Sequence, residues 1–239
     1  MRIDNANHNA NRIQKRHRAC SDTRRRRMVI MKRTLATIVF SLTALVVLTG
    51  CAGKVKYPNY YTLDLPAPPD PPAAENAHAR LEVREFRAPT YLRQGAIVYK
   101  TSPEQIGLYA YDRWAMDPRD FVTNAIIERL RAGGAFAHVQ TYDGRRDVDY
   151  VLSGRLEKLE ELDYQGNVKV EVAISAEMTS IATGATVWSN TVSEIGDVDK
   201  RDVPAVVSEM NRTMQRAIEK LVTPLSAGWA AGSIATRGR

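Results

Sequence analysis

A short apolar run near the amino terminus divides this chain into two parts with different properties. The run covers residues 34–48, follows a Lys-Arg pair and ends two small residues before Cys51. A positive segment, an apolar segment of about 15 residues and a small-residue cleavage site are the layout of a secretory signal. A membrane-spanning helix needs roughly 20 residues. The sequence therefore predicts export and cleavage, and the folded part is expected to begin after the run.

The residues Leu48-Thr49-Gly50-Cys51 resemble the lipobox of bacterial lipoproteins. In that motif a diacylglycerol is attached to the cysteine sulfur, and cleavage then makes the cysteine the first residue. Cys51 is accordingly the predicted lipidation site, and the alternative is an uncleaved anchor with an incidental cysteine. Ala52 stands where an Asp would favour retention in the inner membrane in the familiar sorting system. By resemblance, the protein is expected at the outer membrane, lipid-anchored and facing the periplasm.

The positive charge of the chain belongs to this leader. Its 50 residues hold 11 of the 34 basic residues and 2 of the 27 acidic ones, which leaves 23 basic and 25 acidic residues, a net charge of −2, for the rest. Binding of nucleic acid needs a basic face on the folded part. The composition therefore gives no support for a nucleic-acid partner.

The sequence divides into four predicted parts. Residues 1–50 are a leader, in which 31–50 form the lipoprotein signal peptide. We interpret 1–30 as lying upstream of the true start, with a twin-arginine export signal as the alternative. Residues 51–78 hold the lipidated cysteine, a first strand and a linker with five of the eleven prolines, and a proline-rich ligand for a partner is the alternative reading of that run. The folded domain covers 79–225, and the small, polar tail 226–239 is expected to be disordered.

The folded domain is predicted to be α+β, with a mixed, largely antiparallel sheet and two main helices packed on it. Alternating apolar residues and turn signals predict strands near 60–65, 79–87, 96–100, 105–111, 136–139, 150–156, 168–178 and 187–192. Asp117 and Pro118 are typical of a helix start, and Gly133-Gly134 of its end. A second helix is expected from about Val203 to Val222, ended by Thr223-Pro224, with its methionines in the core.

No catalytic or cofactor-binding motif is present in the sequence, and no cysteine follows Cys51. We therefore predict no enzymatic activity, no cofactor and no metal site. His138 is expected to be a partly buried structural residue. The acidic residues Glu157, Glu160, Glu161 and Asp163 are read as a solvated strand edge, where charges discourage edge-to-edge pairing, with a metal cluster as the weaker alternative.

One aromatic stretch precedes the first helix and is a candidate partner interface. It contains Tyr109, Tyr111, Arg113 and Trp114, and aromatic residues together with arginine are enriched in protein interfaces. The alternative is that Trp114 fills the core. The residue pattern leaves both interpretations open.

Several short motifs in order resemble the ABC-type transport auxiliary lipoproteins, including the paraquat-inducible protein C type. After the lipobox they are Tyr60-Tyr61-Thr62-Leu63, Arg113-Trp114 with Pro118, Gly134-Ala135-Phe136 with Val139, residues 150–156 and residues 183–188. The resemblance covers about residues 51–225. It implies a non-enzymatic lipoprotein that docks on a mammalian-cell-entry-type substrate-binding protein of an ABC transporter, with Cys51 as its one defined functional position.

The sequence alone leaves other roles open. An envelope-assembly lipoprotein or a regulator of a cell-wall enzyme would share the anchor and the absence of a catalytic motif. A periplasmic hydrolase is a third interpretation. Assembly with further copies of the same chain is also left open, as is the identity of the transported solute.

Overall fold

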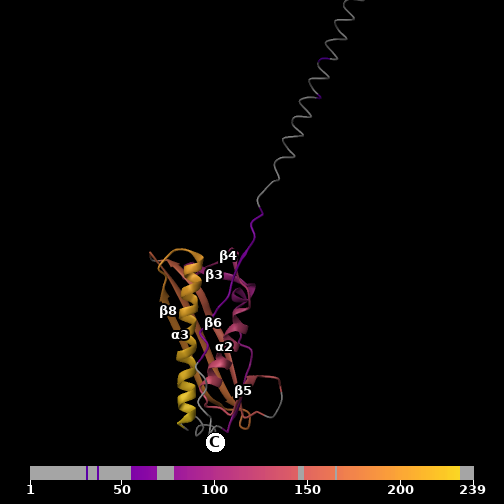
Figure 1. Cartoon of the computed structure of the whole chain (residues 1–239), viewed down its shortest axis with the longest axis vertical. Helices are drawn as coiled ribbons and strands as arrows, with labels where there is room; N and C mark the ends of the chain where they lie inside the picture. The colour runs from indigo at the N-terminus through magenta and orange to yellow at the C-terminus, as the bar shows by residue number, and fades with distance from the viewer. Residues whose placement is uncertain are drawn as a thin grey trace, which may run out of the picture. The chain divides into compact units, whose positions relative to one another are not determined.

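The computed structural model describes residues 31, 37, 55–68, 78–144, 148–164 and 166–231 (Figure 1). The chain forms two compact units, Met1–Lys56 and Tyr57–Arg239, and the fold below is that of the second. Cys51 and residues 232–239 lie outside the described residues, as does most of the leader. In the described ranges, no helix is both long enough and apolar enough to span a membrane.

The second unit is built on one eight-stranded sheet. Its order is β1-β4-β3-β6-β2-β5, and β7 and β8 extend it from the other side of β6. The pairs β3–β4, β6–β7 and β7–β8 are antiparallel, whereas the remaining pairs are parallel. The strands are β1 Asn59–Tyr61, β2 Arg80–Val83, β3 Ala96–Ser102, β4 Gln105–Trp114, β5 His138–Thr141, β6 Tyr150–Tyr164, β7 Asn167–Ser180 and β8 Thr186–Asp197.

Strand β6 is an interior strand of this sheet and pairs with three others. It pairs along its length with β7 on one side. On the other side it pairs with β2 near its start and with β3 near its end. The prediction of a solvated acidic edge in this strand is therefore wrong: Glu160 and Glu161 are only 1% and 4% exposed. Local sequence could not reveal this, because the strands that cover β6 come from distant parts of the chain.

Two helices, α2 Pro118–Ala132 and α3 Val203–Ala230, lie against each other on the sheet (Figure 1). Helix α2 begins as predicted, because the Asp117 side chain accepts a hydrogen bond from the Arg119 backbone nitrogen at 2.9 Å. It ends at Gly133, and Gly134 follows with a φ of 60°, a conformation that favours glycine. A short 3-10 helix, η2 Thr90–Gln94, precedes β3. The predicted α+β class, with a mixed sheet and two helices, is confirmed.

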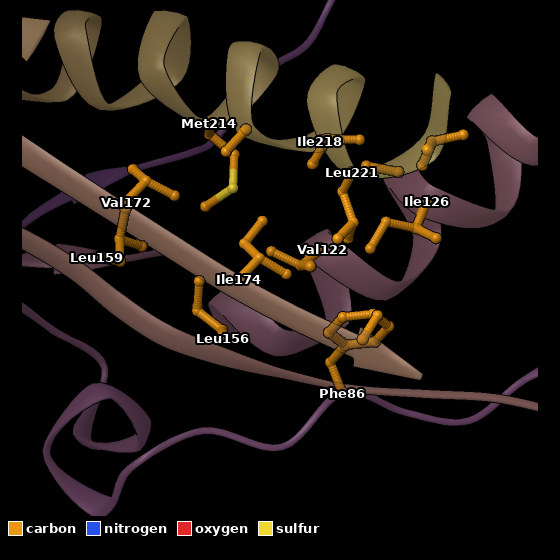
Figure 2. Close-up of a cluster of buried hydrophobic side chains, with 14 of the residues drawn as sticks. Phe86, Val122, Ile126, Leu156, Leu159, Val172, Ile174, Met214, Ile218 and Leu221 are labelled. Atoms are coloured by element: carbon orange, nitrogen blue, oxygen red, sulfur yellow. The ribbon is translucent and has the colours of Figure 1, made fainter. Parts of the chain in front are cut away.

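The core lies between the helices and one face of the sheet (Figure 2). Residues of β6 and β7 meet α2 and α3 there, because alternate positions on each strand are apolar. Met210 and Met214 are fully buried, which confirms the prediction that the α3 methionines belong to the core. The residues labelled in this view are Phe86, Val122, Ile126, Leu156, Leu159, Val172, Ile174, Met214, Ile218 and Leu221.

Helix α3 does not stop at Thr223-Pro224 but continues through Pro224 to Ala230. The predicted helix end is therefore wrong, and so is the prediction of disorder for residues 226–230. Proline inside a helix costs about 3 kcal/mol, so the last two turns need tertiary support. Trp229 supplies it, since its ring stacks on Phe136 at 5.0 Å and meets Tyr150 edge-on at 4.7 Å.

Candidate functional site

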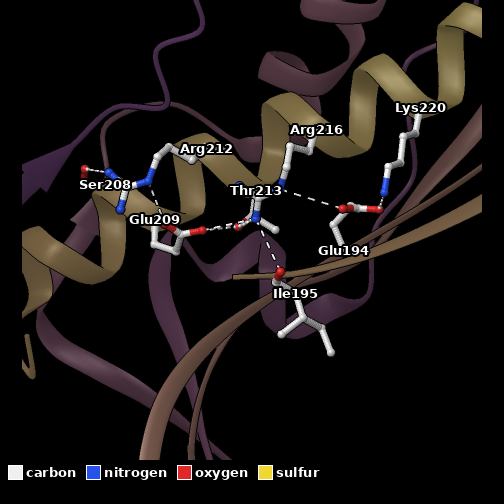
Figure 3. A network of polar contacts seen from close by, with 8 residues as sticks. All are labelled: Glu194, Ile195, Ser208, Glu209, Arg212, Thr213, Arg216 and Lys220. Carbon is white, nitrogen blue, oxygen red and sulfur yellow. Dashed lines mark hydrogen bonds and ion pairs between the residues drawn. The ribbon is translucent and has the colours of Figure 1, made fainter. Parts of the chain in front are cut away.

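A buried carboxylate of α3, Glu209, lies where the helix packs against Gly196 of the edge strand β8 (Figure 3). Glu209 Oε1 accepts hydrogen bonds from the Thr213 hydroxyl at 2.9 Å and from Arg216 Nη2 at 3.2 Å, and its Oε2 accepts from Arg212 Nε at 2.7 Å. Burial by itself disfavours the charged form, but these donors outweigh it and hold the pKa of Glu209 below the usual 4.5. Arg216 also faces Glu194 on β8 at 3.8 Å. The cluster is a fully paired structural contact between helix and sheet.

A second cluster lies under the β3–β4 hairpin. The Tyr109 hydroxyl donates to Glu161 Oε2 at 2.9 Å, and the Tyr109 ring lies 4.9 Å from the ring of Tyr99. Burial raises the pKa of Glu161, and the hydrogen bond from Tyr109 partly opposes this. Burial also raises the pKa of Tyr109, so its hydroxyl stays a donor. Tyr109 is thus held in place by contacts within the sheet.

Trp114 and Arg113 are structural as well. Trp114 is 6% exposed and belongs to the hydrophobic core, so the core interpretation of this residue holds. Arg113 Nη2 donates to the Gln94 carbonyl oxygen at 2.7 Å, and the Trp114 backbone nitrogen donates to the Gly95 carbonyl oxygen at 2.8 Å. These bonds fix the end of η2 to the end of β4.

Tyr111 is the residue of the predicted aromatic interface that reaches the surface. It is 40% exposed, and the same strand exposes Ile106 at 42% and Leu108 at 36%. Strand β4 pairs with β3 on one side, but on the other side β1 covers only Asp112–Trp114. Within the described residues, Gln105–Tyr111 therefore has no second neighbouring strand. We call this segment the β4 edge; its apolar residues were visible in the sequence, but their exposure was not.

Three of the acidic residues of β6 lie close to basic side chains. Glu157 pairs with Arg155 at 2.9 Å, Glu160 lies 3.6 Å from Lys100 Nζ, and Asp163 pairs with Arg201 at 3.2 Å. Burial raises the pKa of Glu160, and Lys100 lowers it. In the part of the chain that the structure describes, no group of three or more His, Cys, Asp or Glu residues could hold a metal ion.

His138 is exposed, which corrects the prediction of a partly buried residue. It lies on β5, which pairs only with β2 among the described strands. Its Nε2 atom lies 2.9 Å from Gln140 Oε1. The residue therefore contacts a neighbour on its own strand.

The fold resembles solved structures. A Xanthomonas campestris protein of the family DUF330 matches with a TM-score of 0.62 and 16% identity, covering 75% of this chain and 99% of that chain. A second crystal structure, of a protein described as uncharacterized, matches with a TM-score of 0.54 and 15% identity over 74% and 99%. At these identities the likeness shows the fold alone. A PelC dodecamer of Paraburkholderia phytofirmans scores only 0.35, with 20% identity over 62% and 91%.

The sequence comparison is more specific about family. No curated protein matches the chain. The family model of the ABC-type transport auxiliary lipoprotein component matches residues 61–222, which include all the strands of the sheet except most of β1, and both helices as far as Val222. The resemblance that the sequence motifs indicated is confirmed. The family is one of auxiliary lipoproteins of transport systems and not a family of enzymes. This chain belongs to the ABC-type transport auxiliary lipoprotein component family.

Proposed function

We propose that this protein is an auxiliary docking subunit of an ABC-type transport system of the mammalian-cell-entry class. In this role it is anchored in the outer membrane through Cys51, faces the periplasm and carries no enzymatic activity. The transport system moves lipid or another apolar solute between the two membranes. The observation that carries the proposal is the family match over residues 61–222, and the lipobox-like residues before Cys51 support the anchor.

The β4 edge is the surface that suits docking. A strand with an unpaired side presents backbone N–H and C=O groups to any extended segment that approaches, and proteins usually guard such edges with charged residues or proline. The β4 edge, Gln105–Tyr111, contains neither, and it exposes Ile106, Leu108 and Tyr111. A partner strand added here would gain main-chain hydrogen bonds and cover these side chains.

Site-specific photo-cross-linking tests this assignment. A cross-linker is placed at Tyr111 in cells, and the captured protein is identified by mass spectrometry. The matched control places it at Thr191, an exposed residue of β8. A mammalian-cell-entry-type protein captured at Tyr111 but not at Thr191 supports the proposal. The proposal fails if neither position captures a transporter component and no ATPase, permease or mammalian-cell-entry gene neighbours this one.

The same experiment separates the alternative function. A regulator of a cell-wall enzyme, or a lipoprotein of envelope assembly, would be cross-linked to a cell-wall enzyme or to an assembly factor. The Ile106→Lys, Leu108→Lys double variant then distinguishes the β4 edge from other surfaces. Because both side chains are exposed, this variant is expected to fold, and loss of capture at Tyr111 would follow from the added charges.

A further inference from the structure

A polar trough of about 670 Å³ lies on the sheet in the first half of β6. Leu156 of β6 and Ile174 of β7 are partners in register and point into the core (Figure 2). Successive residues of a strand point to opposite faces, so the next pair, Arg155 and Ser175, points away from the helices. The trough is thus on the face of the sheet opposite to α2 and α3.

Two arginines of the segment after β2 stand at the rim of this trough, Arg84 and Arg87. The segment is bonded to β6 on both sides of Phe86: the Arg84 nitrogen donates to the Leu152 carbonyl oxygen at 2.8 Å and the Arg87 nitrogen to the Gly154 carbonyl oxygen at 3.0 Å. Phe86 is turned into the core and buried. The Arg84 guanidinium lies 4.1 Å from the centre of the Tyr142 ring, which limits its freedom.

Hydroxyl groups from three adjacent strands form the floor. Ser153, Glu177 and Ser189 stand in one row across β6, β7 and β8, and Arg155, Ser175 and Thr191 stand in the neighbouring row. All six residues line the trough. The Ser175 hydroxyl donates to Glu157 Oε1 at 2.8 Å. The floor therefore offers the hydroxyl groups of Ser153, Ser189 and Thr191 and one carboxylate, without a large apolar side chain.

The charges of the trough do not balance. Arg155 is paired with Glu157 at 2.9 Å, and Glu85 is paired with Arg119 at 3.2 Å. For the side chains of Arg84 and Arg87 the described part of the chain shows no carboxylate partner, and the other carboxylate of the lining besides Glu85 is that of Glu177. The charge that remains after these ion pairs is positive, and the trough is also lined with hydroxyl groups.

We propose that this trough binds a phosphate group, carried by a lipid headgroup or by a free phosphate ester. Guanidinium groups match phosphate oxygens as paired donors, and such charge-assisted hydrogen bonds are stronger than neutral ones. A tetrahedral phosphate takes donors from the rim and the floor together, whereas the two oxygens of a carboxylate lie in one plane. Because the lining has no large apolar side chain, an acyl chain attached to the phosphate lies outside the trough.

Binding is tested on the full chain purified in detergent micelles, with glycerol 3-phosphate and monomeric dihexanoyl phosphatidylglycerol as probes and phosphorus NMR as the readout. The Arg84→Gln, Arg87→Gln double variant is expected to bind about tenfold or more weakly. Glu177→Gln removes the opposing charge and is expected to bind several-fold more tightly. Arg201→Gln, an exposed arginine outside the trough, is the matched control and keeps the original affinity.

The two probes identify the source of the phosphate: tighter binding of the lipid assigns a headgroup, and equal or weaker binding of the lipid assigns a free ester. Thermal unfolding of each variant verifies that it is folded. The proposal is overturned if neither probe binds, if the double variant binds like the original protein, or if Glu177→Gln does not tighten binding. Succinate binding more tightly than glycerol 3-phosphate would also overturn it, because the trough would then prefer carboxylates.

Discussion

The ring of Phe86 lies against Gly154, in the space that a Cβ atom on residue 154 would occupy. This contact lets the segment after β2 run alongside β6 in parallel, with its backbone bonded to the strand. It also places Phe86 in the core while Arg84 and Arg87 remain at the surface. One glycine therefore links the core of the protein to the polar trough on the opposite face.

Gly154→Ala is expected to destabilise the protein by about 1–3 kcal/mol, because the added methyl group overlaps a buried ring that cannot move aside. Urea unfolding measures the change. Gly107→Ala is the control: a Cβ atom there meets the ring of Tyr99, which is only partly buried and can move. Equal stability of the two variants would contradict the tight packing at Gly154.

Glu209→Ala is expected to cost about 1–3 kcal/mol, because it leaves the donors of Thr213, Arg212 and Arg216 without their acceptor. Glu219→Ala, on the same helix with a side chain 44% exposed, should change stability by no more than about 0.5 kcal/mol. Denaturant unfolding at neutral pH compares the two.

The paired carboxylate of Glu209 also predicts a pH dependence. Its pKa in the folded state is below the usual 4.5, so its contribution is fully present above that value and is lost as the pH falls through the folded pKa. Unfolding of the original protein should therefore become easier in this acidic range. The Glu209→Ala variant should lack this part of the loss, and identical pH profiles would refute the assignment.

Glu161 is expected to make the stability of the protein depend on pH in the opposite direction. Burial raises its pKa above the usual 4.5, so stability falls as the pH rises from the ordinary value through the folded pKa. Glu161→Gln keeps an acceptor for the Tyr109 hydroxyl and removes the buried charge. At neutral pH the variant should be at least as stable as the original protein. Its stability should not fall with rising pH in this way, as measured by urea unfolding between about pH 4 and 8. A variant clearly less stable at neutral pH would contradict the prediction.

Trp229→Ala is expected to destabilise the protein by about 2 kcal/mol or more and to release the helix after Pro224. Hydrogen exchange should become faster at residues 225–230, while the first turns of α3 keep their protection. Thr223→Ala, at an exposed position just before the proline, serves as the control. Unchanged exchange in the tryptophan variant would show that the last turns of α3 do not depend on the aromatic contacts.

Cys51→Ala is expected to prevent lipidation and release the protein from the membrane, since several acyl chains supply most of the anchoring free energy. Fractionation of the cell envelope followed by detection of the protein measures this. Ala52→Ser leaves the cysteine in place, and this variant should be found in the same envelope fraction as the original protein. A Cys51→Ala protein that still sediments with the outer membrane would refute the predicted anchor.

Much of the secondary structure follows from local sequence. The helix start at Asp117-Pro118 depends on a side-chain cap and a proline that lie next to each other in the chain. The three-stranded arrangement of β6, β7 and β8 depends on alternation and on turns at Gly166 and Gly184, both with positive φ. These signals act between near neighbours, and so they predicted these elements, although β6 continues to Tyr164, beyond its predicted end at residue 156. The family was also visible, because its motifs occur in order along the chain.

The tertiary structure decided which of these elements are covered. Parallel pairing with β2 and β3 made β6 an interior strand, and so it buried Glu160 and Glu161. Packing of Trp229 against Phe136 and Tyr150 stabilises the part of α3 that follows Pro224. Trp114 is buried in the core, whereas Ile106, Leu108 and Tyr111 are exposed. The sequence by itself determined most of the helices and strands and the family. The burial of a side chain, in contrast, depends on residues that are distant in the sequence. For that reason only the tertiary structure located the β4 edge and the trough with its two arginines.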